Sequence, residues 1–258
     1  MRDLISLSAF PKSGVTYLSF LMFYSLFSDD CAIAEIERRY IIDIHENPNG
    51  AFARPKGPHL IKSHFPYHPN SPAVRQTKQA IYLIRNPIDV MMSAWDFGHL
   101  IKGGARDTAS PAFRAYARNW VETGGAAFAP FGTWVQNVGS WSAQSEIPVH
   151  FVKYEDLVDD AGPQLKAILD FLGIAVSEER QRTAIERSSM KSMAALEAKE
   201  VENQADGIFF RKVLTRGYSE GHRFINKGYR KSYETVLTPE ERSIADKTFA
   251  AELARFYR

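Results

Sequence analysis

The sequence predicts a single α/β domain whose central, mostly parallel sheet is flanked by helices. Short apolar runs that suit buried strands alternate with longer helical patterns, an order typical of parallel strands joined by crossover helices. The length of 258 residues and the hydrophobic content of 45% suit one globular domain over residues 1–258. No internal repeat or low-complexity linker divides the chain.

The first two expected elements are a strand and a helix joined by a tight loop. Residues 4–10 form a short, mostly apolar run that ends at Pro11 and suits a buried strand. From Thr16 onward the chain is apolar and rich in Leu, Phe and Met, which indicates a helix. Residues 59–62 and 80–84 are the next two expected strands.

A second strand-to-helix junction follows the third expected strand. Asn86 is a suitable helix cap and Pro87 a suitable first helical residue, so we expect a helix to begin near Ile88. Residues 149–152 form the fourth expected strand, followed by an acidic turn and a helix whose C-terminal cap is Gly173.

Charge and cysteine content exclude several classes of function. Lys and Arg total 32 and Asp and Glu total 30, which gives a net charge of +2. We therefore expect no nucleic-acid partner, and any polyanion would have to be bound by a local pocket. The single cysteine, Cys31, excludes an internal disulfide bond and argues against a cysteine-based zinc site. We expect no metal cofactor.

The N-terminal region has some features of a secretory signal. Residues 18–27 are apolar and residues 32–34 resemble a cleavage site. However, the preceding segment contains Asp3 and Pro11 and lacks a basic cluster, and the apolar run is too short to span a bilayer. We therefore expect a soluble cytoplasmic protein that does not enter a membrane.

The first candidate motif lies between the first strand and the first helix, where residues 10–17 read Phe-Pro-Lys-Ser-Gly-Val-Thr-Tyr. A glycine-containing loop at a helix N-terminus directs several backbone N–H groups toward one point, where they bind an anion. Lys12 adds a positive charge, and Ser13 and Thr16 add hydroxyl donors. The loop lacks the Gly-x-x-x-x-Gly-Lys-Ser/Thr spacing of nucleotide triphosphatases, and an ordinary turn with a surface lysine fits equally well.

The second candidate motif follows the third strand. Arg85 stands at the carboxyl end of that strand, which is the edge where open α/β sheets bind ligands. Ser93 follows about two helical turns later, a spacing that can return it to the same face. Arg and Ser together suit a phosphate monoester, although a structural salt bridge and a surface serine are the plainer interpretations.

Five sequence blocks, in order, resemble those of the cytosolic-type sulfotransferases, which use 3′-phosphoadenosine 5′-phosphosulfate (PAPS). Residues 10–18 resemble the 5′-phosphosulfate loop of that family, and residues 85–93 resemble its 3′-phosphate motif. The other three blocks are Leu-Ile-Lys-Ser-His-Phe-Pro at 60–66, Lys-Tyr-Glu-Asp-Leu at 153–157 and Lys-Gly at 227–228.

The resemblance implies a donor site for PAPS and for its product 3′-phosphoadenosine 5′-phosphate (PAP). Lys12 would contact the phosphosulfate, Arg85 and Ser93 would hold the 3′-phosphate, and Tyr154 would contact adenine. The implied donor-binding residues are Lys12, Ser13, Gly14, Val15, Thr16, Tyr17, Arg85, Ser93, Tyr154, Ser188, Met190, Lys227 and Gly228.

The chain departs from the family pattern at several of these positions. Val15 replaces the usual Thr, Tyr17 the usual Trp, and Met190 an aromatic residue near adenine. Asn226 stands where the family has an Arg, which leaves one 3′-phosphate contact open. The candidates to supply it are Arg211, Arg216 and Arg230.

The resemblance also implies catalytic roles for His64, Lys12, Lys62 and Ser93. Sulfuryl transfer needs the acceptor oxygen and the leaving phosphate in line, with spreading negative charge stabilised. Lys12 would stabilise the leaving phosphate without a metal. His64 would be the general base, since an imidazole titrates near working pH, and Lys62 would contact the sulfate region or the acceptor. The other histidines are expected to be structural, although His59 and His68 remain candidates for the acceptor pocket.

The expected acceptor is a small-molecule alcohol or phenol, bound by variable segments at 40–58, 98–135 and 205–225. Much of residues 98–135 and 200–232 is expected to be loop. Aromatic side chains there suit an apolar pocket, or equally core packing: Phe97, Phe113, Tyr116, Trp120, Phe128, Phe131, Trp134, Phe209 and Phe210.

Two other classes of function remain open, as does the oligomeric state. One is a small-molecule kinase with a degenerate phosphate loop, and the other is a nucleotide-binding protein without catalysis. Residues 231–240 match the family's dimerisation pattern Lys-x-x-x-Thr-Val-x-x-x-Glu, although three residues out of the expected register, so a homodimer is possible.

Overall fold

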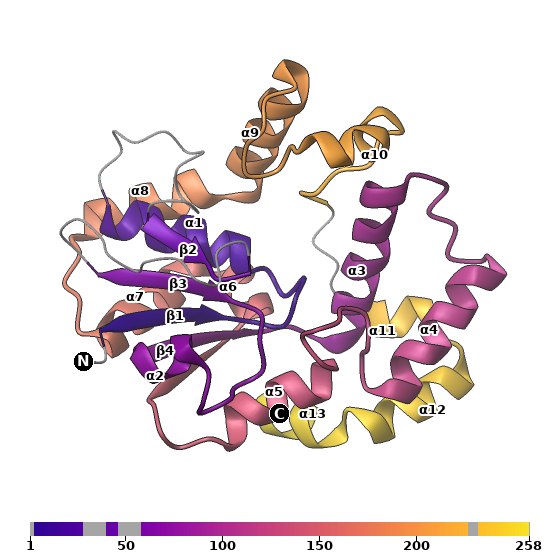
Figure 1. The fold of residues 1–258 in the computed structure, drawn as a ribbon, viewed down its shortest axis with the longest axis horizontal. Helices are drawn as coiled ribbons and strands as arrows, with labels where there is room; N and C mark the ends of the chain where they lie inside the picture. Colours follow the sequence, from indigo (N-terminus) through magenta and orange to yellow (C-terminus); the bar gives the residue numbers. More distant parts are fainter. Residues whose placement is uncertain (1–2, 28–39, 46–57, 227–231, 258) are drawn as a thin grey trace.

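The computed structural model describes residues 3–27, 40–45, 58–226 and 232–257, and five parallel strands form its central sheet (Figure 1). The strand order across the sheet is β2-β3-β1-β4-β5. The strands are β1 (Leu4–Ser8), β2 (Ile41–Asp43), β3 (His59–Ser63), β4 (Thr77–Ile84) and β5 (Val149–Lys153). The predicted α/β fold with a parallel sheet flanked by helices is therefore confirmed, with β2 as a strand that the sequence did not predict.

Helices pack on both faces of this sheet (Figure 1). They are α1 (Val15–Leu26), α2 (Pro72–Gln76), α3 (Pro87–Lys102), α4 (Pro111–Thr123), α5 (Trp134–Ala143), α6 (Tyr154–Asp159), α7 (Ala161–Leu172), α8 (Glu178–Ser188), α9 (Met190–Asn203), α10 (Thr215–Ser219), α11 (Ser232–Val236), α12 (Pro239–Thr248) and α13 (Ala250–Phe256). A short 3₁₀ turn at Lys212–Leu214 precedes α10.

Both faces of the sheet are apolar because each is covered. Side chains alternate along a strand, so Leu83 packs with α1, α7 and α8 on one face while Tyr82 and Ile84 pack with α3, α4 and α5 on the other. Tyr82 is fully buried and its hydroxyl donates to Asn137 Oδ1 at 2.7 Å. This two-sided burial explains the nearly continuous apolar runs of the sequence.

The helix ends that position the site follow local sequence signals. Asn86 caps α3 by accepting from the Ile88 N–H at 3.0 Å, with Pro87 as the first helical residue. Gly173 ends α7 in the left-handed conformation, with φ of 69°. Both features match the sequence prediction.

Segments expected to be rich in loops contain more helix than predicted. Helix α3 continues to Lys102, α4 occupies Pro111–Thr123 of the following segment, and α9 extends to Asn203. Burial of Phe113, Ala117 and Trp120 explains α4, because these residues recur at helical spacing on one face.

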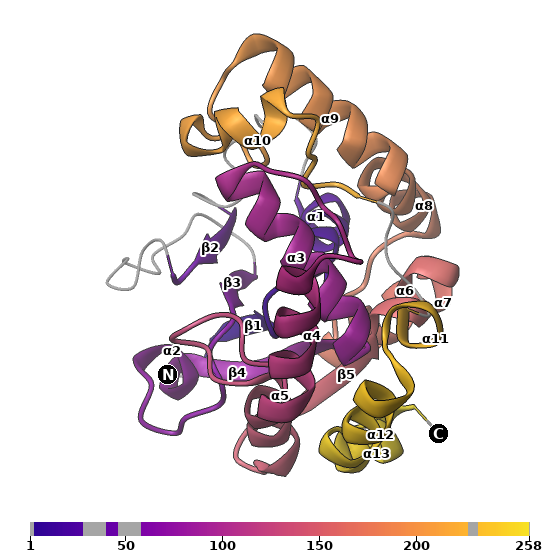
Figure 2. The same ribbon diagram turned by 90° about the vertical axis from the view of Figure 1, so that its right-hand side faces the viewer.

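Helices α9 and α10 lie at the end of the molecule opposite α12 and α13 (Figures 1 and 2). Helix α9 follows α8, and α10 packs on α3, so the two helices overhang the region between α1 and α3. No helix within the described ranges is long and apolar enough to cross a bilayer.

Candidate active site

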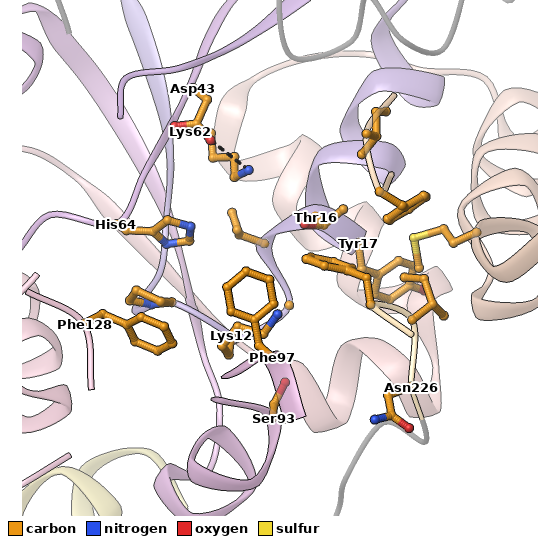
Figure 3. A pocket seen from close by; sticks show the side chains of 18 of the residues that line it. Lys12, Thr16, Tyr17, Asp43, Lys62, His64, Ser93, Phe97, Phe128 and Asn226 are labelled. Carbon is orange, nitrogen blue, oxygen red and sulfur yellow. Dashed lines mark ion pairs between the residues drawn. The ribbon is translucent and has the colours of Figure 1, made fainter. Parts of the chain in front are cut away.

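A pocket of about 500 Å³ opens at the carboxyl edge of the sheet. Each of the five strands delivers a lining residue at or just beyond its carboxyl end. These residues are Lys12 after β1, Asp43 at the end of β2, His64 after β3, Arg85 after β4 and Tyr154 after β5. Figure 3 labels three of these residues, Lys12, Asp43 and His64. This edge is where open α/β sheets bind ligands, as the sequence predicted for Arg85.

The loop between β1 and α1 is held in a conformation that requires Gly14. Gly14 has φ of 99°, in the left-handed region that disfavours side chains. A Cβ atom at this position would lie 2.5 Å from Tyr154 Cδ2, well inside contact distance. Lys12 also has positive φ, 67°, so the loop turns sharply at two positions.

The N-terminus of α1 offers hydrogen-bond donors to an anion. No side chain caps this end of the helix, and its first turn contains no acidic residue. The Ser13 hydroxyl is buried and finds no hydrogen-bond partner among the described residues. A buried hydroxyl without a partner is unfavourable, so this loop fits an anionic ligand that would accept the hydrogen bond.

The Lys12 ammonium lies in the pocket between two aromatic rings. Its Nζ is 4.0 Å from the centre of the Phe97 ring and 4.1 Å from that of Phe224. Burial, and then the positive charges of Arg85 and Lys62, lower the pKa of Lys12 to about 7. The Lys12 ammonium therefore lies close enough to both Arg85 and Lys62 to be repelled by each of them.

Arg85 connects the end of β4 to the loop after β1. Its Nη1 donates to the carbonyl oxygen of Lys12 at 3.0 Å, and its guanidinium lies 4.2 Å from the centre of the Tyr154 ring. Ser93, from α3, lines the same pocket (Figure 3). Arg85 and Ser93 therefore line one pocket, and their joint role at a phosphate stays a prediction.

A buried ion pair joins Lys62 on β3 to Asp43 on β2 (Figure 3). Lys62 Nζ lies 2.9 Å from Asp43 Oδ2, and the two side chains are 9% and 10% exposed. Burial opposes ionisation of Asp43, but the Lys62 ammonium outweighs it and holds the pKa of that carboxyl below its ordinary value. Lys62 and Asp43 are neighbours in the parallel register of β2 and β3.

The imidazole of His64 is held in one orientation. Its Nδ1 lies 2.8 Å from the carbonyl oxygen of Ala9, so Nδ1 carries a proton and donates it there. Burial, followed by the positive charge of Lys62, lowers the pKa of His64 to about 3. At neutral pH the ring is uncharged and its Nε2 has an open lone pair, which is the form required of a general base.

Most of the predicted site residues line this pocket. The predicted residues along its wall are Lys12, Gly14, Val15, Thr16, Tyr17, Lys62, His64, Arg85, Ser93, Tyr154 and Met190. Ser13 lies buried within the loop. Ser188 is the buried last residue of α8, and its hydroxyl donates to the Ala184 carbonyl at 2.7 Å. Lys227 and Gly228 lie outside the described residues.

Of the three candidates to replace the family arginine expected at Asn226, only Arg211 is among the described residues that line the pocket. Arg211 lines the pocket, as does Asn226, whose Nδ2 donates to the carboxylate of Asp96. Arg216 instead pairs with Glu220 at 3.0 Å, and Arg230 lies outside the described residues.

The aromatic residues of the predicted acceptor segments divide between pocket and core. Four line the pocket: Phe97, Phe128, Phe131 and Phe209. Four others are buried in the core: Phe113, Trp120, Trp134 and Phe210. Tyr116 packs beside the core and donates to the Met91 carbonyl at 3.0 Å, and neither His59 nor His68 is among the lining residues.

Two carboxylates on α9 hold one wall of the pocket, and the sequence did not predict them. Glu200 accepts from the N–H groups of Phe209 and Phe210 at 2.8 and 2.9 Å. Glu197 accepts from those of Phe224 and Ile225 at 2.6 and 2.9 Å. Glu residues three apart on a helix suggest only a solvated face, so no sequence signal pointed to this role.

The fold defines an α/β protein with a pocket at the carboxyl edge of its parallel sheet, and Lys12, Lys62 and Arg85 line that pocket. The sulfotransferase domain family matches residues 2–257, so the chain belongs to the sulfotransferase family. The family prediction is thus confirmed.

Similar proteins include sulfotransferase 2A6 of Rattus norvegicus, 27% identical over 203 residues, which are 78% of this chain and 66% of the rat protein. Cytosolic sulfotransferase 15 of Arabidopsis thaliana is 27% identical over 235 residues, 81% of this chain and 64% of that protein. The chain therefore spans slightly less than two thirds of these relatives.

Solved structures of similar fold include mouse sulfotransferase SULT7A1 complexed with PAP, with a TM-score of 0.68 and 20% identity over 100% of this chain and 86% of that one. A second is retinol dehydratase in complex with androsterone and PAP, with a TM-score of 0.70 and 19% identity over 98% and 81%. Within the described ranges, no three His, Cys, Asp or Glu side chains form a group suited to a metal ion.

Proposed function

We propose that this protein is a PAPS-dependent sulfotransferase that moves a sulfuryl group to a hydroxyl of a small-molecule acceptor. The donor would lie along the loop at residues 10–17, with Arg85 and Ser93 at its 3′-phosphate. Membership of the sulfotransferase family supports this proposal, as do relatives named sulfotransferases. The name of the Arabidopsis relative supports a cytoplasmic location.

The convergence of three cations carries the donor side of the proposal. Lys12, Lys62 and Arg85 line one pocket, and after burial, repulsion by the charges of Arg85 and Lys62 contributes to the low pKa of Lys12. An anion with several charges would relieve that repulsion and accept hydrogen bonds from the loop. PAPS carries such charge at both its 3′-phosphate and its phosphosulfate.

The proposed transfer assigns one role to each polar group. His64 Nε2 takes the proton of the acceptor hydroxyl as its oxygen bonds to sulfur. The bond from sulfur to the bridging oxygen breaks, and its electron pair stays on the 5′-phosphate of PAP. Lys12 stabilises that developing charge, and Lys62 contacts the sulfuryl oxygens.

The proposed base becomes stronger when the donor binds. In the ligand-free protein the pKa of His64 is about 3, lowered by burial and then by Lys62. Negative charge beside the imidazole would offset the effect of Lys62 and raise this pKa toward the working range. Donor binding would therefore favour proton transfer to His64.

The acceptor side of the pocket favours an apolar alcohol or phenol. Phe128 and Phe131 line the pocket near His64, and Phe131 lies 5.7 Å from the His64 ring between centres. Apolar walls with a few convergent polar groups are typical of small-molecule sites.

Calorimetric titration with PAP, without metal, tests the donor site. We expect tight binding to the wild type and at least a 100-fold loss in Arg85→Ala, because the guanidinium binds phosphate and braces the loop. Arg75→Ala is the control, since Arg75 is exposed and contacts Asn70. No binding of PAP, with Mg²⁺-dependent binding of ATP, would favour the kinase alternative instead.

A PAPS assay then separates catalysis from binding alone. We expect sulfation of a phenol probe such as 4-nitrophenol by the wild type and its loss in His64→Ala, with PAP affinity retained. Binding of PAP without transfer to any of a panel of alcohols and phenols would favour a nucleotide-binding protein without catalysis.

A further inference from the structure

A second histidine, His45, contacts His64, the candidate general base, through a hydrogen bond and a stacked ring. His45 follows β2, the edge strand, and β2 runs parallel to β3 with Asp43 paired to Lys62. This register brings His45 beside His64. The backbone N–H of His64 donates to His45 Nε2 at 2.7 Å, a short and direct hydrogen bond.

The two imidazole rings also stack. Their planes are 14° apart and their centres are separated by 5.1 Å. The ring of His45 contacts Phe65 and Phe131 on its other sides, each at 4.6 Å between centres. His45 is not among the residues that line the pocket, so it supports His64 without facing a ligand itself.

This hydrogen bond fixes the tautomer of His45. Its Nε2 accepts a proton, so the neutral ring carries hydrogen on Nδ1. Its own backbone N–H donates to Asp43 Oδ1 at 2.9 Å, and the other oxygen of Asp43 pairs with Lys62. Asp43 at the end of β2 and His45 just beyond it therefore support Lys62 on β3 and His64 just beyond β3.

We propose that His45 is a positioning residue for His64, in an extension that rests on the proposed sulfotransferase function. The hydrogen bond from the His64 N–H to His45 Nε2 fixes the backbone position of His64. The stacked ring of His45 fixes the plane of the His64 imidazole. With Nδ1 bonded to Ala9, only Nε2 is left for the acceptor hydroxyl. Small errors in the position of a catalytic group cost large factors in rate.

Two substitutions separate the hydrogen bond from the packing. His45→Phe keeps a flat ring against His64 but cannot accept a hydrogen bond, whereas the amide oxygen of His45→Gln can. With PAPS and 4-nitrophenol we expect kcat to fall by about 10- to 100-fold in His45→Phe. We expect PAP affinity to change less than twofold, and most of kcat to return in His45→Gln.

A spectroscopic readout tests the positioning without any substrate. Histidine ring ¹⁵N spectra should show the Nδ1–H tautomer of His64 in the wild type and in His45→Gln, and a mixture of tautomers in His45→Phe. His59→Phe is the control, because His59 lies at the other end of β3 and contacts Asp3 at 3.4 Å.

The outcomes distinguish this inference from the proposed function. Full kcat and an unchanged His64 tautomer in His45→Phe would overturn the positioning role. So would equal losses of kcat, PAP affinity and thermal stability that His45→Gln does not rescue, which is the pattern of a structural residue. If the wild type neither binds PAP nor transfers sulfate, the proposed function fails, and the tautomer spectra alone decide whether His45 positions His64.

Discussion

The guanidinium of Arg85 donates to the main-chain carbonyl of Lys12 across 3.0 Å, which ties the end of β4 to the loop after β1. One side chain therefore connects two parts of the proposed donor site. Its guanidinium also lies over the Tyr154 ring, which follows β5. Three neighbouring strands, β1, β4 and β5, are linked at their carboxyl ends through Arg85.

Replacing this guanidinium by another cation should weaken the site despite the retained charge. In Arg85→Lys we expect PAP affinity to fall about 10-fold or more, because an ammonium cannot hold the Lys12 carbonyl and a phosphate with the same fork of donors. Calorimetry with PAP measures the change, and circular dichroism checks the fold. Affinity equal to that of the wild type would show that only the charge of Arg85 matters.

The contact of Gly14 with Tyr154 predicts a larger effect of Gly14→Ala than backbone strain alone would give. Both Gly14 and Gly173 have positive φ, 99° and 69°, but a Cβ at Gly173 meets nothing within 4 Å. We expect Gly173→Ala to cost about 1–2 kcal/mol for the left-handed backbone. Gly14→Ala should cost clearly more and should abolish PAP binding.

Urea unfolding of the two variants measures this difference. The comparison controls for backbone strain, because the two positions differ in what surrounds the added methyl group. Equal losses of stability, with PAP binding retained in Gly14→Ala, would mean that Tyr154 moves aside easily.

The low pKa of Lys12 predicts a pH dependence of donor binding. The anion favours the charged ammonium, but Lys12 in the ligand-free protein loses its proton near pH 7, mainly because it is buried. PAP affinity should therefore fall as pH rises from 8 to 9.5, where the phosphates of PAP no longer titrate, by up to about tenfold per pH unit. Calorimetry in buffers of different ionisation enthalpy should also show proton uptake.

Lys12→Arg is the matched control for this effect, because a guanidinium stays charged throughout that range. Its PAP affinity should not depend on pH between 8 and 9.5, and a wild type with the same flat profile would contradict the prediction. The free energy of unfolding should change with pH in the opposite direction to PAP affinity. The unfolded chain keeps the Lys12 proton up to about pH 10.5 and the native chain releases it near 7, so Lys12 makes unfolding free energy rise between these values.

The sequence predicted the site residues that lie close to the end of a recognisable strand. Lys12, His64 and Arg85 stand one or two residues after predicted strands, and parallel strands bring such positions together at one edge. Asp43 and His45 could not be predicted in this way, because β2 has only three residues and too short an apolar pattern to identify. Their partners became evident only from the register of β2 on β3.

The wall formed by α9 was missed for a different reason. Glu197 is 2% exposed, although its position in a charged helix predicts a solvated side chain. Its carboxylate is buried because it accepts two backbone N–H groups from a segment 27 residues further along the chain. Side-chain contacts to distant backbone groups leave no periodic pattern in a sequence.

The ion pair of Asp43 and Lys62 predicts that the isosteric substitution Asp43→Asn lowers the free energy of unfolding strongly. Asp43→Asn keeps an oxygen for the His45 N–H but removes the charge that faces Lys62. Because both side chains are about 10% exposed, we expect a loss of about 3–5 kcal/mol of unfolding free energy. Chemical denaturation at neutral pH measures it.

Asp170→Asn is the surface counterpart, since Asp170 pairs with Lys166 and the side chains are 64% and 68% exposed. That pair should contribute less than about 1 kcal/mol. Bound PAP should partly restore the stability of Asp43→Asn, because the ligand supplies negative charge near Lys62. Equal effects of the two substitutions would indicate that solvent screens the Asp43 pair as well.

A chain of contacts runs from Tyr257, near the C-terminal end, to the proposed donor site. The Tyr257 hydroxyl donates to Glu155 Oε2 at 3.0 Å, and Glu155 Oε1 accepts from the N–H of Asn86 at 2.9 Å. Burial, and then the charge of Glu155, raise the pKa of Tyr257, so its hydroxyl remains a donor at all working pH values. The chain of contacts ends at the turn that carries Arg85.

Tyr257→Phe should therefore weaken PAP binding by about 3- to 10-fold, since it removes one hydrogen bond to a charged group and loosens the turn without touching the pocket. Tyr233→Phe is the matched control, because the Tyr233 hydroxyl donates to Asp246 at 2.6 Å on the protein surface. We expect no change of PAP affinity there. Arg85→Lys combined with Tyr257→Phe should weaken binding less than the product of the single effects, because both act through the position of one turn; a fully additive result would place the two contacts in independent roles.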